Sequence, residues 1–456
     1  MGDQKGWFAS SMAKGVEMMA KAKTGSRPEF EKAVCEIFES ERLREIAKET
    51  EMIKRERKID PVIIFWSLIF GFGVELKRSL ASLKRKYEQG AKAKISDSSW
   101  YDRFSPELVL FLKECVKLGI EQYGEKEHRK LTEKLKNFED VLIQDSTIIR
   151  VHESLAKKWP AVRTRKAAAG VKVSLLVSAV ANGPKTIALR SENTAEIKTL
   201  KIGPWIKNRI LLIDLGFYKH QMFARIEENN GFFVSRLKGV ANPTIISVNS
   251  ACRGNSIDLV GKKWKDVLPL LKRQVLDAEV EINLKRRKYK GKQRGDVKRF
   301  RLIAHYNDET KKYHAYLTNI PKETLDPEEI ASLYGARWEI ELIFKELKGK
   351  YSLDVLETKN PHTIAALIWV AILTMIVSRT IYHCYRDWGN LTGKDVVRFT
   401  QQRWNNHFCE RSNDYQYAVL DHLGIEYSLM DSFELSMSQV RDPHVDRKRF
   451  REEWWT

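Results

Sequence analysis

The sequence predicts an α/β protein in which a mixed sheet with flanking helices is interrupted by a β-rich insertion and bounded by helical N- and C-terminal regions. Three observations lead to this fold class. Residues 1–135 carry helical spacing and many charges. From about residue 138, β-branched segments alternate with helical ones, and residues 239–325 return to short alternating segments typical of hairpins.

Length and charge narrow the range of functions. The chain has 456 residues, which is enough for two or three domains with a large core. Its 80 lysines and arginines exceed its 60 acidic residues, for a net charge of +20. We expect a chain this basic to bind a polyanion, and nucleic acid before a membrane surface.

Cysteine usage and hydropathy indicate the compartment. The five cysteines are scattered, without a Cys-x-x-Cys pair or a Cys/His cluster, so neither a disulfide framework nor a zinc finger is indicated. The apolar runs Val62–Val74 and Thr363–Ser378 fall short of the roughly 20 residues that a bilayer requires. The N-terminus has no signal-peptide apolar region. We therefore expect two buried helices in a cytoplasmic protein with no membrane partner.

The N-terminal region is predicted to be helical. Glu29–Lys54 and Val74–Glu88 carry helical spacing, and a serine-rich cluster then offers N-caps for a short helix with Trp100, Tyr101 and Arg103. A helix, a turn and a second short helix suit a helix-turn-helix that contacts DNA. The same pattern is also typical of helical hairpins that contact no nucleic acid.

The central region is predicted to hold the sheet. Its strands are expected at Val141–Val151, Val171–Val180, Lys185–Arg190, Arg209–Leu215 and Gly231–Leu237, with helices at Thr194–Lys207 and Lys219–Glu228. This order describes a mixed sheet covered by helices.

The insertion is basic and mainly β. Lys285–Arg301 is densely basic around a glycine-bearing turn, and Arg301–His305 and Lys312–Leu317 alternate like hairpin strands. Its basic face is expected to contact a phosphate backbone, and the alternative is a solvated hairpin.

A polar stripe marks the segment that follows. Asp326–Lys350 is predicted to be one helix that starts at an Asp326 N-cap. At about 100° per residue, Tyr334, Arg337, Glu341 and Lys348 share one narrow stripe. Taken alone, such a stripe is typical of a solvated charged face. A buried helix over Thr363–Tyr382 and a helical C-terminal tail are expected to complete the chain.

Two aspartates elsewhere in the chain suggest a function for this stripe. Asp145 lies within the first predicted strand, and Asp214 closes the fourth. Each alone is typical of a turn or cap, but in a ribonuclease H-like sheet the two strands are neighbours and the two carboxylates converge. Glu341 would supply a third. Three carboxylates suit hard Mg²⁺ or Mn²⁺, and two such ions about 3.5–4 Å apart can promote phosphodiester chemistry.

These residues resemble those of a known family. Tyr334, Arg337, Glu341 and Lys348 match the Y-x2-R-x3-E-x6-K signature of DDE transposases of the insertion-sequence-four family at every spacing. The DST at Asp145 and the DLGF at Asp214 resemble the first and second aspartate motifs of that family. The gap of 127 residues (341 − 214) accommodates the β insertion that the family places before the glutamate.

The resemblance implies roles for the site residues. Asp145, Asp214 and Glu341 would bind two Mg²⁺ ions, for which Mn²⁺ substitutes, and Tyr334, Arg337 and Lys348 would contact DNA phosphates. The implied activity is cleavage at insertion-sequence ends followed by transfer of the 3′-hydroxyl to target DNA. It also implies a homodimer with DNA, in a prokaryotic cytoplasm and on the nucleoid.

The expected organisation has five parts: a helical DNA-end-binding domain at 1–135, a ribonuclease H-like core at 136–238, the insertion at 239–325, the second part of the core at 326–382, and a helical region at 383–456 that is a candidate for dimerisation.

Three alternatives stay open at this point. One is a ribonuclease H-like nuclease or resolvase that does not integrate DNA, and another is a non-catalytic DNA-binding protein descended from a transposase. The third concerns the route of excision. Relatives that form a DNA hairpin place a tryptophan in the insertion, whereas the strand here carries Tyr313, His314 and Tyr316.

Overall fold

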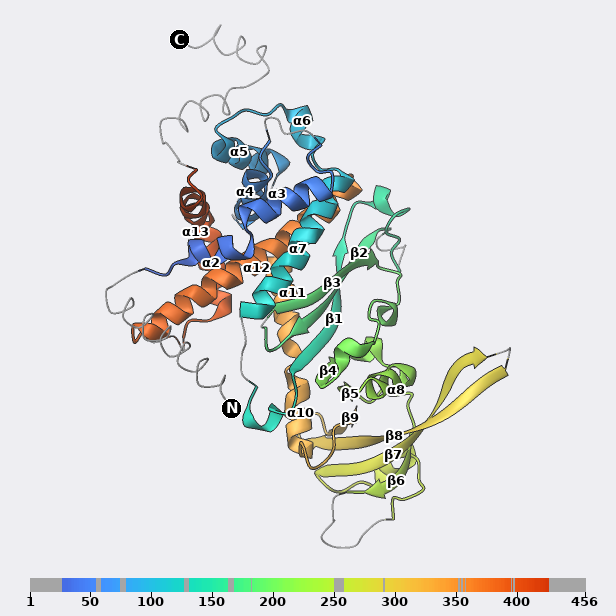
Figure 1. Ribbon diagram of the computed structural model, residues 1–456. Helices are drawn as coiled ribbons and strands as arrows, with labels where there is room; N and C mark the ends of the chain where they lie inside the picture. The colour runs from blue at the N-terminus through green and yellow to red at the C-terminus, as the bar shows by residue number, and fades with distance from the viewer. Residues whose placement is uncertain are drawn as a thin grey trace, which may run out of the picture. The chain divides into compact units, whose positions relative to one another are not determined.

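The computed structural model describes most of the chain in two compact units (Figure 1). The described residues are 27–54, 59–73, 79–126, 131–162, 168–181, 183–249, 258–289, 292–351, 353, 356, 358–394, 396 and 398–425. One unit, the helical unit, contains the described residues up to Gly119 together with those within Glu346–Leu353 and those from Asn360 to residue 425. The other, the sheet unit, comprises Ile120–Lys345 and Asp354–Lys359.

The helical unit is built around the long apolar helix α12. Its helices are α2 (Phe30–Ile37), α3 (Ser40–Glu49), α4 (Pro61–Gly73), α5 (Leu80–Ala91), α6 (Asp97–Tyr101), most of α7 (Pro106–Lys126), α12 (Pro361–Leu391) and α13 (Gln401–His422). Helices α2, α4 and α13 pack on α12. Asn360 caps α12 by accepting hydrogen bonds from the backbone N–H groups of His362 and Thr363.

Both apolar runs are buried helices, as the sequence predicted. By length and composition α12 could cross a membrane, yet its most apolar window is fully buried inside the structure. Its single buried arginine, Arg379, lies 2.9 Å from the carboxylate of Glu346, and each side chain is about nine-tenths or more buried. This pairing explains how a cation is accommodated in an otherwise apolar helix.

Two predictions for the N-terminal helices were wrong in detail. Glu29–Lys54 forms two helices, because the chain leaves helical geometry at Phe38, whose ring is buried in the core. Helix α5 begins at Leu80 behind a Ser79 cap. The first part of the helix predicted at Val74–Glu88 lies outside the described residues.

A single nine-stranded mixed sheet runs through the sheet unit. Its strands are β1 (Asp140–Arg150), β2 (Gly170–Ser178), β3 (Gly183–Ser191), β4 (Arg209–Ile213), β5 (Phe232–Arg236), β6 (Thr244–Val248), β7 (Val275–Tyr289), β8 (Lys292–Asn307) and β9 (Lys312–Thr318). Their order across the sheet is β3-β2-β1-β4-β5-β9-β8-β7-β6. Among the strand pairs in the described residues, β1–β4 and β4–β5 are parallel and the others are antiparallel. The fold class and all five predicted core strands are therefore confirmed.

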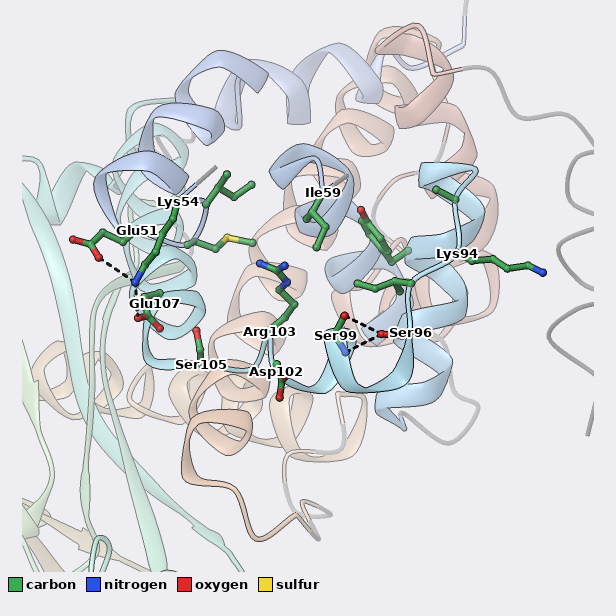
Figure 2. Close-up of a pocket in the computed structure, with 15 residues that line it drawn as sticks. Glu51, Lys54, Ile59, Lys94, Ser96, Ser99, Asp102, Arg103, Ser105 and Glu107 are labelled. Carbon is green, nitrogen blue, oxygen red and sulfur yellow. Dashed lines mark hydrogen bonds and ion pairs between the residues drawn. The ribbon is translucent and has the colours of Figure 1, made fainter. Parts of the chain in front are cut away.

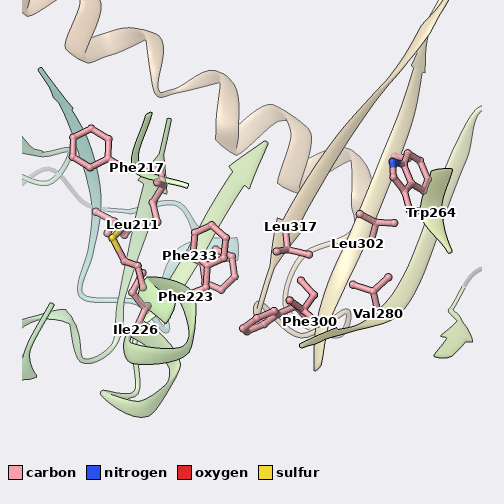
Figure 3. Close-up of a cluster of buried hydrophobic side chains, with 14 of the residues drawn as sticks. Leu211, Phe217, Phe223, Ile226, Phe233, Trp264, Val280, Phe300, Leu302 and Leu317 are labelled. Carbon is pink, nitrogen blue, oxygen red and sulfur yellow. The ribbon is translucent and has the colours of Figure 1, made fainter. Parts of the chain in front are cut away.

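The insertion is continuous with the rest of the sheet. Strand β9 pairs with β5, and β7 and β8 form a long hairpin that extends past the other strands in Figure 1. An aromatic cluster joins the two parts (Figure 3). Phe223, from α8 (His220–Glu228), stacks on Phe233 with ring centroids 4.4 Å apart, and Phe300 of β8 meets Phe233 edge-on at 5.3 Å.

The helix predicted at Thr194–Lys207 does not form. That stretch contains two short 3-10 turns, η3 (Glu196–Lys198) and η4 (Pro204–Ile206). Two features account for this. The Thr199 hydroxyl bonds back to the Glu196 carbonyl at 2.6 Å, and Gly203 adopts an extended conformation before Pro204.

Candidate active site

Asp145 and Asp214 lie side by side because their strands are parallel neighbours. The last register pair between β1 and β4 is Gln144 with Ile213, and each aspartate is the next residue along its strand. Asp145 is 17% exposed and Asp214 is 39% exposed. The expected convergence of these two carboxylates at one sheet edge is thus observed.

The segment carrying Glu341 is two helices, not the single helix that the sequence predicted. Helix α10 (Pro327–Gly335) starts with an Asp326–Glu329 capping box, and α11 (Trp338–Gly349) follows after a turn. At this turn the backbone N–H groups of Ala336, Arg337 and Glu339 bond to carbonyls three residues earlier, as in a 3-10 helix.

The tightened turn alters the geometry of the predicted stripe, because 3-10 geometry rotates each residue further than α-helical geometry does. Tyr334 and Arg337 nevertheless both lie beside Asp214. Trp338, the first residue of α11, is 58% exposed, whereas Tyr334 is 7% exposed.

Arg337 contacts all three predicted metal ligands. One of its guanidinium nitrogens lies 3.4 Å from Asp145, another lies 4.0 Å from Asp214, and a third hydrogen-bonds to Glu341. A single cationic side chain 18% exposed therefore lies among three carboxylates drawn from β1, β4 and α11. This ion pairing offsets the repulsion between the carboxylates.

The other two signature residues have different surroundings. The Tyr334 hydroxyl donates to the carbonyl of Ile213 at 3.4 Å, and its ring packs on Tyr316. Burial raises the pKa of Tyr334 to about 12, with a further contribution from the charge of Asp214. Lys348 is half-buried in the last turn of α11, in the stretch that clusters with the helical unit.

The acidity of Asp145 is strongly perturbed by its surroundings. Burial raises its pKa to about 6, and the charges of Asp214 and Glu196 add to the rise. The backbone N–H of Ser146, 2.7 Å from the Asp145 carboxylate, and the charge of Arg337 oppose it. Asp145 therefore ionises at the cost of desolvation, which favours a cation beside it.

Sequence reasoning missed a fourth carboxylate, Glu196. The Ser146 hydroxyl donates to Glu196 at 2.9 Å, and Gly216 approaches Glu196 closely. Glu196 itself gives no signal for this contact, because an acidic residue in a polar stretch is usually solvated. Gly216, directly after Leu215 in the Asp214 motif, is the one local hint that a side chain approaches the backbone there.

The chemistry of these donors fits a hard divalent cation. All the acidic groups are carboxylates, whose oxygens are the ligands that Mg²⁺ and Mn²⁺ prefer. With Arg337 between them, the described part of the chain holds no group of three or more His, Cys, Asp or Glu side chains placed to bind a metal ion. Binding would require Arg337 to move away from the carboxylates.

The helical unit contains a pocket of about 800 Å³ with a mixed charged lining. Its basic residues are Lys54, Lys94 and Arg103, its acidic residues are Glu51, Asp102 and Glu107, and the Arg103 side chain points into it (Figure 2). Ser96 caps α6 as expected.

Trp100 belongs to the core instead of to a DNA-contacting surface. Its ring stacks on Tyr87 at 5.6 Å, and its indole N–H donates to the carbonyl of Leu80 at 2.8 Å. Tyr101 is 47% exposed. The short helix ends at Tyr101, so Arg103, which was predicted to lie on it, follows in the next turn. Of the three residues singled out, Tyr101 and Arg103 are the two that a ligand can reach.

The sheet topology and the clustered carboxylates are typical of an enzyme that acts on DNA. Comparison with known proteins agrees. Residues 136–377, which are 242 of the 456 residues, match the transposase DDE domain family. The chain belongs to this family, and its DDE domain implies a dependence on divalent metal ions.

Transposases are among the proteins that this chain resembles. The chain is 23% identical over 373 residues to the transposase for insertion sequence element IS231F of Bacillus thuringiensis subsp. israelensis, covering 74% of this chain and 76% of that protein. It is 22% identical over 381 residues to the transposase for IS1151 of Clostridium perfringens, covering 77% and 80%. A segment of 57 residues, 12% of this chain, is 40% identical to 15% of the putative transposase InsL for IS186A of Escherichia coli strain K12. The predicted resemblance is confirmed.

Proposed function

We propose that this transposase cuts DNA at the ends of an insertion sequence and joins the freed 3′-hydroxyl to target DNA, using Asp145, Asp214 and Glu341 to hold two Mg²⁺ ions. Mn²⁺ is expected to substitute. The observation that carries the proposal is the ion pairing of one guanidinium with all three carboxylates, which brings together residues from three distant parts of the sequence.

The bound ions would supply activation of the attacking oxygen and stabilisation of the leaving 3′ oxygen. The protein groups supply the rest. The parallel pairing of β1 with β4 holds Asp145 beside Asp214. The capping box at the start of α10 fixes where the helical segment that carries Glu341 begins. Fixed carboxylates need little rearrangement when the cations bind.

Arg337 would exchange partners during the reaction. In the DNA-free protein it pairs with the carboxylates, and in the DNA complex it would contact a phosphate oxygen. Lys348 is proposed to contact a second phosphate. Tyr334 would also do so, once its hydroxyl leaves the Ile213 carbonyl.

The remaining regions are assigned as follows. Residues 1–135 would bind the DNA end, with Arg103 facing a phosphate, and the β insertion at 239–325 would contact the DNA backbone through its basic hairpin. The core would comprise 136–238 and 326–382, and residues 383–456 would contribute to a homodimer that pairs two DNA ends. The protein would act in the prokaryotic cytoplasm, on the nucleoid.

The test uses the full chain and linear DNA that carries the repeats flanking its own gene. With Mg²⁺, we expect 3′ cuts at the repeat ends and joined products in an added plasmid. Asp145→Ala, Asp214→Ala and Glu341→Ala should each abolish cutting and keep most DNA binding in a gel-shift assay. The matched controls Glu153→Gln and Asp258→Asn remove exposed carboxylates of the same unit and should cut normally.

The products also separate the alternatives. Cutting without joined products would indicate a nuclease that does not integrate DNA. Binding without cutting by the unmodified chain would indicate a DNA-binding protein that has lost catalysis. Undiminished cutting by any of the three alanine variants would remove that residue from the site.

A further inference from the structure

Glu196 contacts the two segments that carry the catalytic aspartates. One carboxylate oxygen accepts the hydroxyl of Ser146 at 2.9 Å, and the backbone N–H of Ser146 donates to Asp145 at 2.7 Å. The other oxygen lies against Gly216, which follows Asp214 by two residues in η5 (Leu215–Phe217). Glu196 thus bridges the segment after Asp145 and the segment after Asp214.

The contact with Gly216 depends on the absence of a side chain there. A Cβ atom added at Gly216 would lie 1.5 Å from one Glu196 carboxylate oxygen, and its three nearest atoms would all belong to Glu196. Any residue other than glycine at this position would therefore displace the carboxylate. The backbone at Gly216 is not in the left-handed region, so the need for glycine comes from this close approach.

A buried hydrogen-bond relay holds Glu196 in place. The side chain of Gln144, next to Asp145 on β1, donates to Ser174, the Ser174 hydroxyl donates to Thr199, and the Thr199 hydroxyl donates to the Glu196 carbonyl. Gln144 and Ser174 are 2% and 3% exposed. The 3-10 turn that carries Glu196 is therefore tied to the same strand as the first aspartate.

Ion pairing does not account for the position of Glu196. In the described part of the chain it has no salt-bridge partner, and its carboxylate contacts are the Ser146 hydroxyl and the backbone at Gly216.

We infer that Glu196 is a positioning residue that keeps the segments bearing Asp145 and Asp214 at the separation a divalent cation requires. This inference rests on the proposed function of the two aspartates. Glu196 acts through Ser146 and the backbone at Gly216. Removing side chains that orient metal-binding carboxylates typically weakens metal binding about 10- to 100-fold.

The test measures Mn²⁺ binding to the DNA-free full chain by electron paramagnetic resonance of the free ion. Glu196→Ala should raise the Kd for Mn²⁺ about tenfold or more. Gly216→Ala should raise it similarly, because the new methyl group pushes the carboxylate away while the fold is kept. The control Gly239→Ala, whose added Cβ would meet nothing within 4 Å, should leave the Kd unchanged.

Two further variants distinguish positioning from other roles. The double variant Glu196→Ala/Gly216→Ala should bind Mn²⁺ no more weakly than either single variant, since the methyl group at 216 then meets no carboxylate. Glu196→Gln keeps the oxygen that accepts the Ser146 hydroxyl and should stay within about threefold of the unmodified chain. In DNA cleavage by Glu196→Ala, the half-saturating Mg²⁺ concentration should rise by a larger factor than the factor by which the rate at saturating Mg²⁺ falls.

Three results would overturn the inference: an unchanged Kd in Glu196→Ala, additive effects in the double variant, or a Glu196→Gln variant as weak as Glu196→Ala. The last of these would assign the effect to charge. Near-ultraviolet circular dichroism checks that each variant is folded. If Asp145→Ala also cuts DNA normally, the proposed function fails instead, so the two failures are distinguishable.

Discussion

The guanidinium of Arg337 lies 3.4 Å from the carboxylate of Asp145, across 192 residues of sequence. The same group hydrogen-bonds to Glu341 one turn further along α11. An internal cation thus lies among the carboxylates that are proposed to bind divalent ions, and this arrangement leads to a prediction for metal affinity.

Arg337→Ala should tighten Mn²⁺ binding by the DNA-free chain, by at least about tenfold, because the competing positive charge is removed. The same variant should cut end-bearing DNA more slowly, since the proposed phosphate contact is lost. Calorimetric titration with Mn²⁺ measures the first effect and a cleavage assay the second. Arg150→Ala, which removes an arginine paired with Glu192, serves as the control. Weaker Mn²⁺ binding by Arg337→Ala would contradict competition.

The raised pKa of Asp145 predicts a pH-dependent stability. Its folded-state pKa of about 6 exceeds the ordinary value of 3.8, so the folded protein binds more protons than the unfolded chain between those values. The contribution of Asp145 to the free energy of unfolding therefore falls as the pH rises from about 4 to about 6, by up to about 3 kcal/mol.

Asp145→Asn should consequently be more stable than the unmodified chain at pH 7.5 in EDTA, and the difference should shrink toward pH 4. Urea unfolding at several pH values measures this. Equal differences at pH 7.5 and pH 4.5 would show that the ionisation of Asp145 is not the cause.

A buried ion pair supports the start of the Glu341 segment. Arg301 pairs with Asp277 at 2.7 Å, and both side chains are less than one-tenth exposed. Arg301 also donates to the carbonyl of Leu325 at 2.7 Å, directly before the Asp326 cap. Arg301→Met should lower the free energy of unfolding by about 3–5 kcal/mol, because Asp277 is left buried without its cation.

Denaturant unfolding measures this loss, and the double variant Arg301→Met/Asp277→Leu should recover much of it. As a comparison, Arg411→Met breaks an exposed pair with Asp414 and should cost less than about 1 kcal/mol. A loss of similar size in the two single variants would mean that burial of the Arg301 pair is unimportant.

The basic hairpin should contribute to DNA binding through phosphates. Lys292 and Arg299 are exposed on β8. Replacing both with alanine should weaken binding to end-bearing and unrelated DNA alike, and should flatten the salt dependence of log Kd by up to about 2. Gel shifts from 50 to 200 mM NaCl test this. Lys262→Ala/Lys265→Ala removes two exposed lysines elsewhere in the insertion, and an equal effect there would indicate non-specific charge.

Arg103 should matter for DNA binding in the helical unit. Its side chain points into the 800 Å³ pocket, so Arg103→Ala should raise the Kd for end-bearing DNA about fivefold or more (Figure 2). Fluorescence anisotropy with labelled DNA provides the measurement. Lys94 lines the same pocket, so Lys94→Ala tests whether the loss of affinity is specific to the Arg103 guanidinium. An unchanged Kd in Arg103→Ala would place DNA binding elsewhere.

Much of the site could be predicted from the sequence because it depends on sheet register. Strand positions follow from β-branched density, and once β1 and β4 are parallel neighbours, Asp145 and Asp214 must meet. The spacing that resembles a known signature then predicted Glu341 as the third carboxylate. These inferences depend on the spacing of residues within single strands and helices, which tertiary contacts do not change.

The missed features depend on tertiary contacts. The turn at Arg337 could not be seen, because helical-wheel reasoning assumes 100° for every residue. Glu196 lay within a stretch predicted to be helical, and only the fold brings it to Ser146. The burial of Trp100 likewise follows from Tyr87 packing on it.

The continuity of the sheet has a consequence for how related chains can diverge. Since β9 is anchored on β5 and leads directly to α10, the outer ends of β7 and β8 can grow or shrink without shifting Glu341. The length of the β7–β8 hairpin can therefore vary, whereas the segment from Thr318 to Asp326 must keep its length and path. A variant whose hairpin is shortened by equal numbers of residues on β7 and β8 should keep its affinity for metal ions and change only its affinity for DNA.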